Sequence, residues 1–167
     1  MYSKQINLDR KIAKYFTLRE VFASETARVN KINNIPRDWC EFVKVFKSAF
    51  HLSRKVLDPI REAYGVMNIT SWHRCRVLID AMDCIKTTQH GKGEAVDFVY
   101  SSGVLRVIFK AIVSGELEVP YDQIIFEKRG SVYWIHISHK YRGNNRRKAL
   151  VSPSAGCYVP YGVVDLC

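Results

Sequence analysis

The hydrophobic positions of the first half of the chain repeat at helical spacing. They predict one long amphipathic helix through Trp39, Phe42, Val43, Phe46, Ala49, Phe50, Val56, Leu57, Ile60 and Ala63. Pro59 lies inside this pattern and should bend or split the helix near Asp58, because proline cannot donate the helical hydrogen bond. Gly65 is a natural end for the helix. Upstream, Thr17 and Glu20 have the spacing of a capping box in front of a short helix.

After Gly65 the pattern changes to short runs rich in β-branched and aromatic residues. These runs predict strands at residues 66–72, 95–100, 123–127 and 132–138. A helix is expected between the second and third, at about residues 102–115, with an apolar face made by Leu105, Ile108, Phe109 and Ile112. We therefore predict an α+β fold in which helices flank a small antiparallel sheet.

The last two predicted strands should form a hairpin through residues 128–131. Side chains alternate across a strand, so His136 shares one face with Trp134 and Ser138, while the intervening apolar residues occupy the other. His136 should therefore point to the open face of the sheet.

The length of 167 residues suits a single domain. We assign residues 1–150 to this domain and residues 151–167 to a C-terminal tail. The tail contains Pro153, Gly156, Pro160 and Gly162, which favour irregular structure.

The composition adds a strong positive charge to this picture. With 26 Lys and Arg residues against 16 Asp and Glu residues, the net charge is +10, which favours an anionic partner. The 47% of hydrophobic residues argues against a disordered protein. Five cysteines without a Cys-x-x-Cys pair argue against a disulfide framework or a cysteine zinc cluster.

The N-terminus carries charges where a signal peptide has its apolar run, and no stretch reaches the ~20 apolar residues of a membrane span. We expect a soluble product made in the cytoplasm.

Three residues of the C-terminal half are candidate metal ligands. His90 precedes a pair of glycines, Asp97 follows in the next strand, and His136 lies in the last strand. Two imidazoles and a carboxylate suit Zn²⁺ and leave a fourth position for water, whose pKa zinc can lower to about 7. The spacing alone favours a structural interpretation, with a loop histidine, a salt-bridged aspartate and a hydrogen-bonded sheet histidine, because two histidines and an aspartate so far apart are a weak motif.

The sequence around these residues resembles the zinc D-Ala-D-Ala carboxypeptidase and phage endolysin family of peptidoglycan peptidases, whose fold is shared with hedgehog N-terminal domains. The similar segments occur in the same order over about residues 15–150. They are Val56-Leu57-Asp58-Pro59-Ile60-Arg61-Glu62, Ile69-Thr70-Ser71-Trp72-His73-Arg74, Thr88-Gln89-His90-Gly91-Lys92-Gly93-Glu94-Ala95-Val96-Asp97, Asp122-Gln123-Ile124-Ile125-Phe126-Glu127, Trp134-Ile135-His136 and Asn145-Arg146-Arg147.

The resemblance implies that His90, Asp97 and His136 bind Zn²⁺. It also implies an acidic general base, which many relatives carry three residues before the last histidine ligand. That position is Tyr133 here, so Glu127 on the neighbouring strand is the candidate.

The same resemblance places Arg74 at the position of an arginine that contacts the substrate or the oxyanion. Thr88, Gln89 and Trp134 are further candidate substrate-binding residues. His73, beside Arg74, is more typical of a pocket wall than of a fourth ligand.

The expected activity is hydrolysis of peptide bonds in bacterial peptidoglycan stem peptides, by an endolysin-type endopeptidase or a D-Ala-D-Ala carboxypeptidase. We expect a monomer that reaches the wall after holin-type release and is attracted to the anionic bacterial envelope. Two alternatives stay open. One is a basic nucleic-acid-binding protein, although a peptidase of this kind is not expected to bind nucleic acid. The other is a catalytically silent zinc-binding domain of the same fold.

Overall fold

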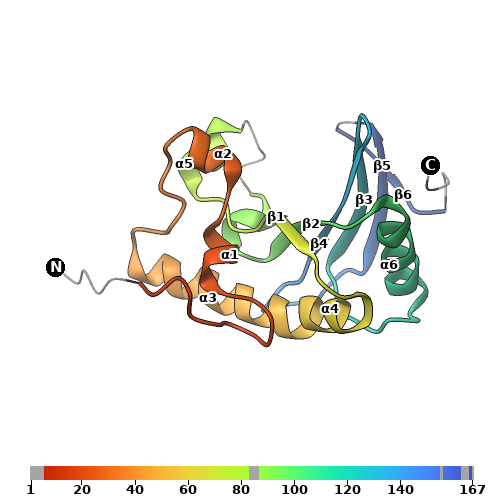
Figure 1. Cartoon of the computed structure of the whole chain (residues 1–167), viewed down its shortest axis with the longest axis horizontal. Coiled ribbons are helices and arrows are strands. Elements are labelled where there is room, and N and C mark those ends of the chain that lie inside the picture. The colour runs from red at the N-terminus through yellow and green to blue at the C-terminus, as the bar shows by residue number, and fades with distance from the viewer. Residues whose placement is uncertain (1–5, 83–86, 155, 163–165, 167) are drawn as a thin grey trace.

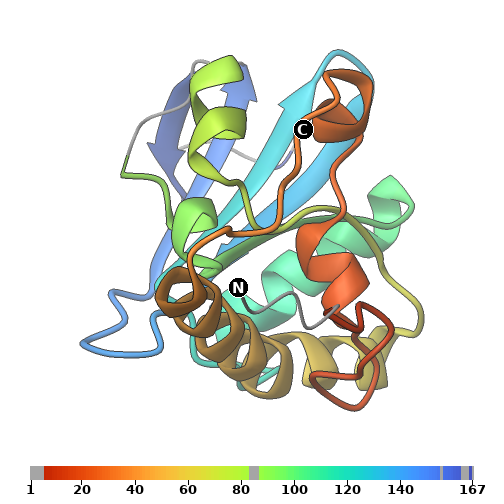
Figure 2. The same ribbon diagram turned by 90° about the vertical axis from the view of Figure 1, so that its left-hand side faces the viewer.

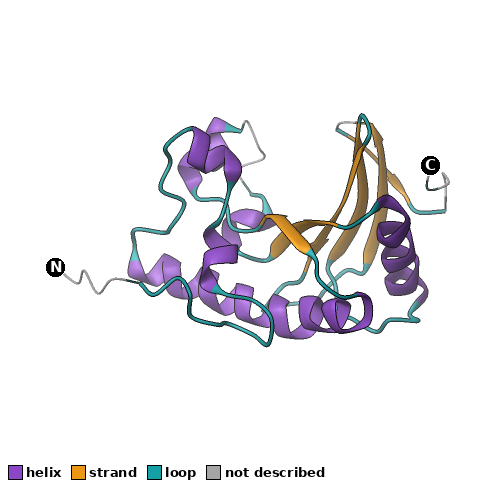
Figure 3. Cartoon of the chain, in the orientation of Figure 1, coloured by secondary structure: helices purple, strands orange, loops and turns teal. Residues whose placement is uncertain are grey.

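The computed structural model describes residues 6–82, 87–154, 156–162 and 166. Helices dominate its N-terminal half, and most of the sheet comes from its C-terminal half (Figures 1 and 3). In chain order the elements are α1 (Leu18–Phe22), α2 (Glu25–Val29), α3 (Trp39–Leu52), η1 (Ser53–Leu57), α4 (Asp58–Tyr64), β1 (Asn68–Ser71), α5 (Arg76–Ala81), η2 (Gln89–Lys92), β2 (Ala95–Val99), α6 (Ser102–Ser114), β3 (Gln123–Arg129), β4 (Val132–Ser138), β5 (Lys148–Ser154) and β6 (Cys157–Pro160).

The long helical pattern forms three consecutive segments at the base of the molecule (Figure 1). The π-helix η1 separates α3 from α4, and the backbone N–H of Asp58 bonds to the carbonyl of Ser53 five residues earlier. Pro59 then lies in the first turn of α4, where its missing N–H is tolerated. The predicted division near Asp58 is confirmed, and so is the end of the helix at Gly65, whose φ is 85°.

The capping box of α1 is also confirmed. Glu20 accepts a hydrogen bond from the backbone N–H of Thr17 at 2.8 Å. Helices α2 and α5 span only five and six residues, and η2 is a single 3₁₀ turn. Elements this short hold too few turns for a helical repeat to show in the sequence.

The strands form one mixed sheet in the order β1-β2-β4-β3-β5-β6. The predicted hairpin of β3 and β4 is confirmed, and His136 pairs with Ile125 across it. The α+β class holds, but the prediction of an antiparallel sheet is wrong for one pair, because β5 runs parallel to β3. The connection after β4 returns to the start of β3, where the N–H of Lys148 donates a hydrogen bond to the carbonyl of Asp122. Strand β5 therefore begins beside the start of β3 and runs in the same direction as β3.

Irregular structure was expected after residue 150, and this expectation is wrong for residues 151–154 and 157–160, which lie in β5 and β6. Leu150 and Val151 are buried opposite Ile125 and Phe126, so burial outweighs the nearby breakers. Pro153 lies where the pairing of β5 with β6 shifts register, a position at which a missing N–H is tolerated.

The hydrophobic core lies between one face of the sheet and helices α3, α4 and α6. The predicted apolar face of α6 is confirmed, because Leu105, Ile108, Phe109 and Ile112 are fully buried. From the side, the strands stand above the helical layer (Figure 2). The opposite sheet face carries Asp97, Glu127, Trp134 and His136.

No helix among the described segments is long and apolar enough to cross a membrane.

Candidate metal centre

A groove of about 1050 Å³ runs over the open face of the sheet. Thr88, Gln89 and His90 line it from the loop before β2, and strands β3, β4, β5 and β6 line it from the sheet side. Every residue that the sequence suggested for chemistry or substrate binding lines this one groove: Arg74, Thr88, Gln89, His90, Asp97, Glu127, Trp134 and His136. The fold therefore collects residues that are up to 62 positions apart in the chain.

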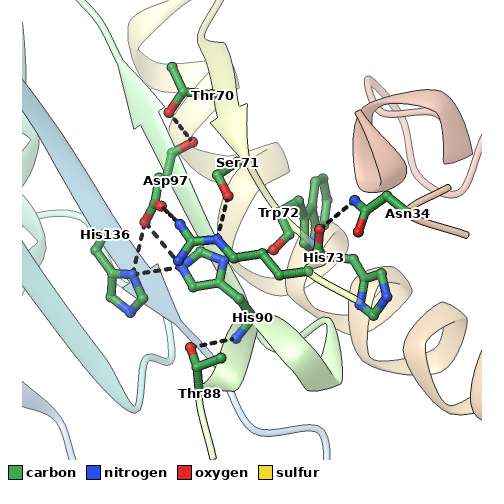
Figure 4. Close-up of polar contacts among 10 residues, drawn as sticks. Asn34, Thr70, Ser71, Trp72, His73, Thr88, His90, Asp97 and His136 are labelled. Carbon is green, nitrogen blue, oxygen red and sulfur yellow. Dashed lines mark hydrogen bonds and ion pairs between the residues drawn. The ribbon is translucent and has the colours of Figure 1, made fainter. Parts of the chain in front are cut away.

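His90, Asp97 and His136 converge at the floor of the groove (Figure 4). Asp97 Oδ1 lies 2.9 Å from His136 Nδ1 and 3.3 Å from His90 Nε2, and the two nitrogens are 3.2 Å apart. Strand pairing produces part of this arrangement, since Asp97 on β2 is the register partner of His136 on β4.

The imidazole of His90 is oriented by Trp72. Its Nδ1 lies 2.7 Å from the carbonyl oxygen of Trp72, so this nitrogen carries the proton and donates it to the carbonyl. Nε2 of neutral His90 is then an unprotonated acceptor facing Asp97. The fully buried indole of Trp72 also donates a hydrogen bond to the carbonyl of Gly93, which fastens both sides of the η2 turn.

Neutral His90 is the form that this environment favours. Burial lowers the pKa of His90 below its ordinary value, against the opposing influence of the Asp97 carboxylate. Burial alone would raise the pKa of Asp97, but that pKa lies well below its usual range, and the hydrogen bond between His136 and the carboxylate is one cause. A lone pair of His90 therefore faces an ionised carboxylate oxygen, and a shared cation would relieve the repulsion between them.

The three atoms fit a tetrahedral ion. With zinc–ligand bonds of about 2.0–2.1 Å, neighbouring ligand atoms of a tetrahedral site are roughly 3.3 Å apart. The separations of 2.9, 3.2 and 3.3 Å are close to that value. The group could thus hold a metal ion, and among the residues that the structure describes it is the one cluster of His, Cys, Asp or Glu side chains with this property.

The second oxygen of Asp97 faces away from the imidazoles. Oδ2 accepts a hydrogen bond of 2.7 Å from Nη2 of Arg74, in an ion pair with little solvent exposure. Arg74 Nε in turn donates to Ser71 Oγ at 2.9 Å, and Thr70 Oγ1 donates to the backbone carbonyl of Asp97 (Figure 4). Thr70 and Ser71 were not predicted, although both lie in the segment that carries the family resemblance.

Glu127 lies on the same sheet face as the cluster. It pairs with Trp134, two residues along the hairpin from the pair of Ile125 and His136. Burial raises the pKa of Glu127, and the nearby charge of Asp97 adds to the shift, while His136 opposes it. Tyr133 instead packs against Phe126 on the core side, so this residue cannot replace the missing acid.

Two of the remaining candidates shape the turn that carries His90. Thr88 Oγ1 accepts a long hydrogen bond of 3.4 Å from the backbone N–H of His90. Gln89 donates to Asp122 at 3.3 Å. Asp122 is fully buried and also binds Lys140 and Arg146, which hold its pKa below the usual range despite its burial. Sequence reasoning gave Asp122 no role, although it begins one of the similar segments.

His73 is not part of the cluster. Its ring points to the side opposite Asp97 and His136 (Figure 4) and packs edge-on against Phe22. It is fully buried, and burial lowers its pKa to about 4. His73 is absent from the groove lining, so the pocket-wall interpretation is wrong: its ring is buried beside Phe22 of the hydrophobic core.

The groove is strongly cationic apart from its floor. Its lining includes seven basic side chains against the carboxylates of Asp97 and Glu127: Arg74, Lys92, Lys128, Arg129, Lys140, Arg146 and Lys148. Ser152 of β5 and Tyr158 of β6 also line it. Neither was predicted, because the local sequence carries no sign that β5 pairs with β3 and β6 with β5.

Comparison with protein-family models, curated proteins and solved structures gave no match to this chain.

Proposed function

We propose that the protein is a zinc-dependent peptidase that hydrolyses peptide bonds of bacterial peptidoglycan stem peptides. The observation that carries the proposal is the convergence of His90 Nε2, Asp97 Oδ1 and His136 Nδ1 at the floor of a long groove. Three protein ligands of mixed nitrogen and oxygen type are typical of catalytic zinc sites, whereas structural zinc sites are normally closed by four. The resemblance described above supplies the reaction and substrate class.

Each ligand residue has a defined part in this proposal. His90 would bind through Nε2, because Trp72 occupies its Nδ1, and His136 would bind through Nδ1. Zinc held by these atoms and Asp97 would supply Lewis acidity for the scissile carbonyl and for an attacking water.

Glu127 is the proposed general base. A carboxylate that accepts a proton from the attacking water and passes it to the leaving amine works best with a pKa near the working pH. The upward shift that burial produces at Glu127 is in this direction. Its position two pairs along the hairpin from His136 is on the same sheet face as the proposed metal ligands, and both residues line the groove.

The charge of the groove supports an anionic substrate. Lys92, Lys140, Arg146 and Lys148 line it, and the buried carboxylate of Asp122 offsets only part of their charge. Peptidoglycan stem peptides carry carboxylates, so the groove and substrate are electrostatically complementary.

The first test combines metal analysis with digestion of purified peptidoglycan. We expect about one zinc per chain and new amino and carboxyl ends at one type of stem-peptide bond, identified by mass spectrometry. His90→Ala should lose both zinc and hydrolysis, while His51→Ala, on α3 outside the groove lining, should keep both. Zinc binding without any bond cleavage would instead indicate a catalytically silent zinc-binding domain, and absence of zinc would exclude the proposal.

The second test concerns Glu127. Glu127→Gln keeps the size of the side chain but removes the proton acceptor, so we expect kcat to fall by roughly 10²–10⁴-fold with zinc content unchanged. Glu62→Gln is the matched control, because Glu62 is exposed and paired with Lys14 away from the cluster. Wild-type kcat in Glu127→Gln would remove Glu127 from the mechanism.

A further inference from the structure

We propose that Arg74 is a positioning residue of the metal centre, which restricts Asp97 to one ligand oxygen. This inference rests on the proposed function, because it concerns how the proposed zinc ligands are held.

The two oxygens of Asp97 have separate partners. Oδ1 faces His136 Nδ1 at 2.9 Å and His90 Nε2 at 3.3 Å. Oδ2 accepts the hydrogen bond from Arg74 at 2.7 Å. Because a carboxylate rotates as a unit, the bond at Oδ2 fixes the direction of Oδ1. A metal at the convergence point therefore meets one oxygen of Asp97.

Arg74 is itself fixed at two further points. Its Nε donates to Ser71 Oγ at 2.9 Å, and its backbone N–H donates to the carbonyl of His90 at 3.2 Å. Ser71 is the register partner of Asp97, next to an irregularity in the pairing of β1 with β2. The segment after β1 thus holds two of the three proposed ligands, Asp97 through a side chain and His90 through the backbone.

Burial makes this contact rigid. The side chains of Arg74 and Asp97 are 14% and 10% exposed, so water competes weakly for the carboxylate oxygen. A bond between a guanidinium and a carboxylate in such a setting is stronger than one at the surface.

This role differs measurably from the role that the family resemblance implies for Arg74. A residue that contacts only the substrate or oxyanion changes the reaction rate and leaves the metal centre as it was. A residue that positions Asp97 changes the metal centre itself, before any substrate is added.

The experiment uses the full chain loaded with Co²⁺, whose visible absorption reports coordination, together with Zn²⁺ affinity measured by competition with a chromophoric chelator. Arg74→Met keeps much of the side-chain length but removes every donor. We expect Zn²⁺ affinity to fall roughly 10–100-fold, and the Co²⁺ bands to weaken as Asp97 binds through both oxygens. Arg74→Lys should restore part of both signals.

The matched control is Arg76→Met. Arg76 lies two residues further along the same segment and pairs with exposed Asp80 at the surface of α5. We expect it to leave Co²⁺ absorption and Zn²⁺ affinity at wild-type values. Should Arg74→Met fail to fold, Ser71→Ala tests the same contact more gently, with an expected loss of roughly two- to tenfold in Zn²⁺ affinity.

Wild-type Co²⁺ spectra and Zn²⁺ affinity in Arg74→Met, or in Ser71→Ala where that variant is used, would overturn the positioning role and leave the proposed function intact. Failure of the wild-type chain to bind either metal would overturn the proposed function, and this inference with it.

Discussion

The burial of His73 gives a sharp prediction about acid stability. His73 is fully buried and neither ring nitrogen has a hydrogen-bond partner within the described structure. Burial lowers its pKa from 6.5 to about 4. The folded protein therefore keeps His73 neutral at a pH where the unfolded chain takes up a proton.

The direction of the effect follows from proton binding. Between about pH 6.5 and pH 4 the unfolded state binds the extra proton, so acidification favours unfolding and stability rises with pH through this window. The pKa of His73 is 6.5 in the unfolded state and about 4 in the folded state. The free energy of unfolding at about pH 5 should therefore be about 2 kcal/mol lower than at about pH 7.5. Below pH 4 the loss in the free energy of unfolding approaches about 3.4 kcal/mol.

The assay is urea unfolding of the wild type and His73→Leu at about pH 7.5 and pH 5, with a chelator present so that metal does not contribute. Leucine has nearly the volume of histidine and cannot titrate. On acidification the free energy of unfolding of the variant should therefore fall by about 2 kcal/mol less than that of the wild type. Zinc affinity at neutral pH should be unchanged, because His73 lies outside the cluster. Equal acid sensitivity of the two proteins would refute the argument from burial, and loss of zinc in the variant would refute the placement of His73.

Two further predictions concern the His90 turn and the charge of the groove. Gly93→Ala should lower the free energy of unfolding by about 1–3 kcal/mol. The reason is that φ at Gly93 is +71° and a Cβ there would lie 2.9 Å from the backbone oxygen of Val45. Denaturant titration measures this free energy. Gly143→Ala is the control, because φ there is +90° but a Cβ would meet nothing within 4 Å. It therefore carries the backbone strain without the clash, and should lower the free energy of unfolding by less than Gly93→Ala does. Wall digestion should slow as salt is raised from about 0.05 to 0.5 M, since added ions screen the attraction between a +10 protein and an anionic wall. Turbidity measurements on isolated walls test this, and a rate that does not depend on salt would contradict electrostatic attraction.

Several features of the fold could be predicted from the sequence because each is encoded within one element. The apolar face of α6, the break before Asp58, the capping box of α1 and the alternation of β4 all depend on neighbours within a few residues. The nomination of His90, Asp97 and His136 also came from the sequence, since the residue types suit zinc and similar segments occur in a known order.

Short helices and the C-terminal strands were not readable in this way. β5 contains Pro153 and follows a basic run, and its identity as a strand depends on Leu150 and Val151 finding buried partners on β3. Its parallel direction depends on where the chain returns after β4, which no local pattern specifies.

The sequence by itself therefore determined the longer helices, the hairpin of β3 and β4, and which side chains could bind a metal. Only the tertiary structure decided how those side chains are held: His90 by the carbonyl of Trp72, and Asp97 by Arg74. The physical reason is that residue types and periodicity are local properties, whereas the direction of a lone pair depends on hydrogen bonds between segments that fold together from distant parts of the chain.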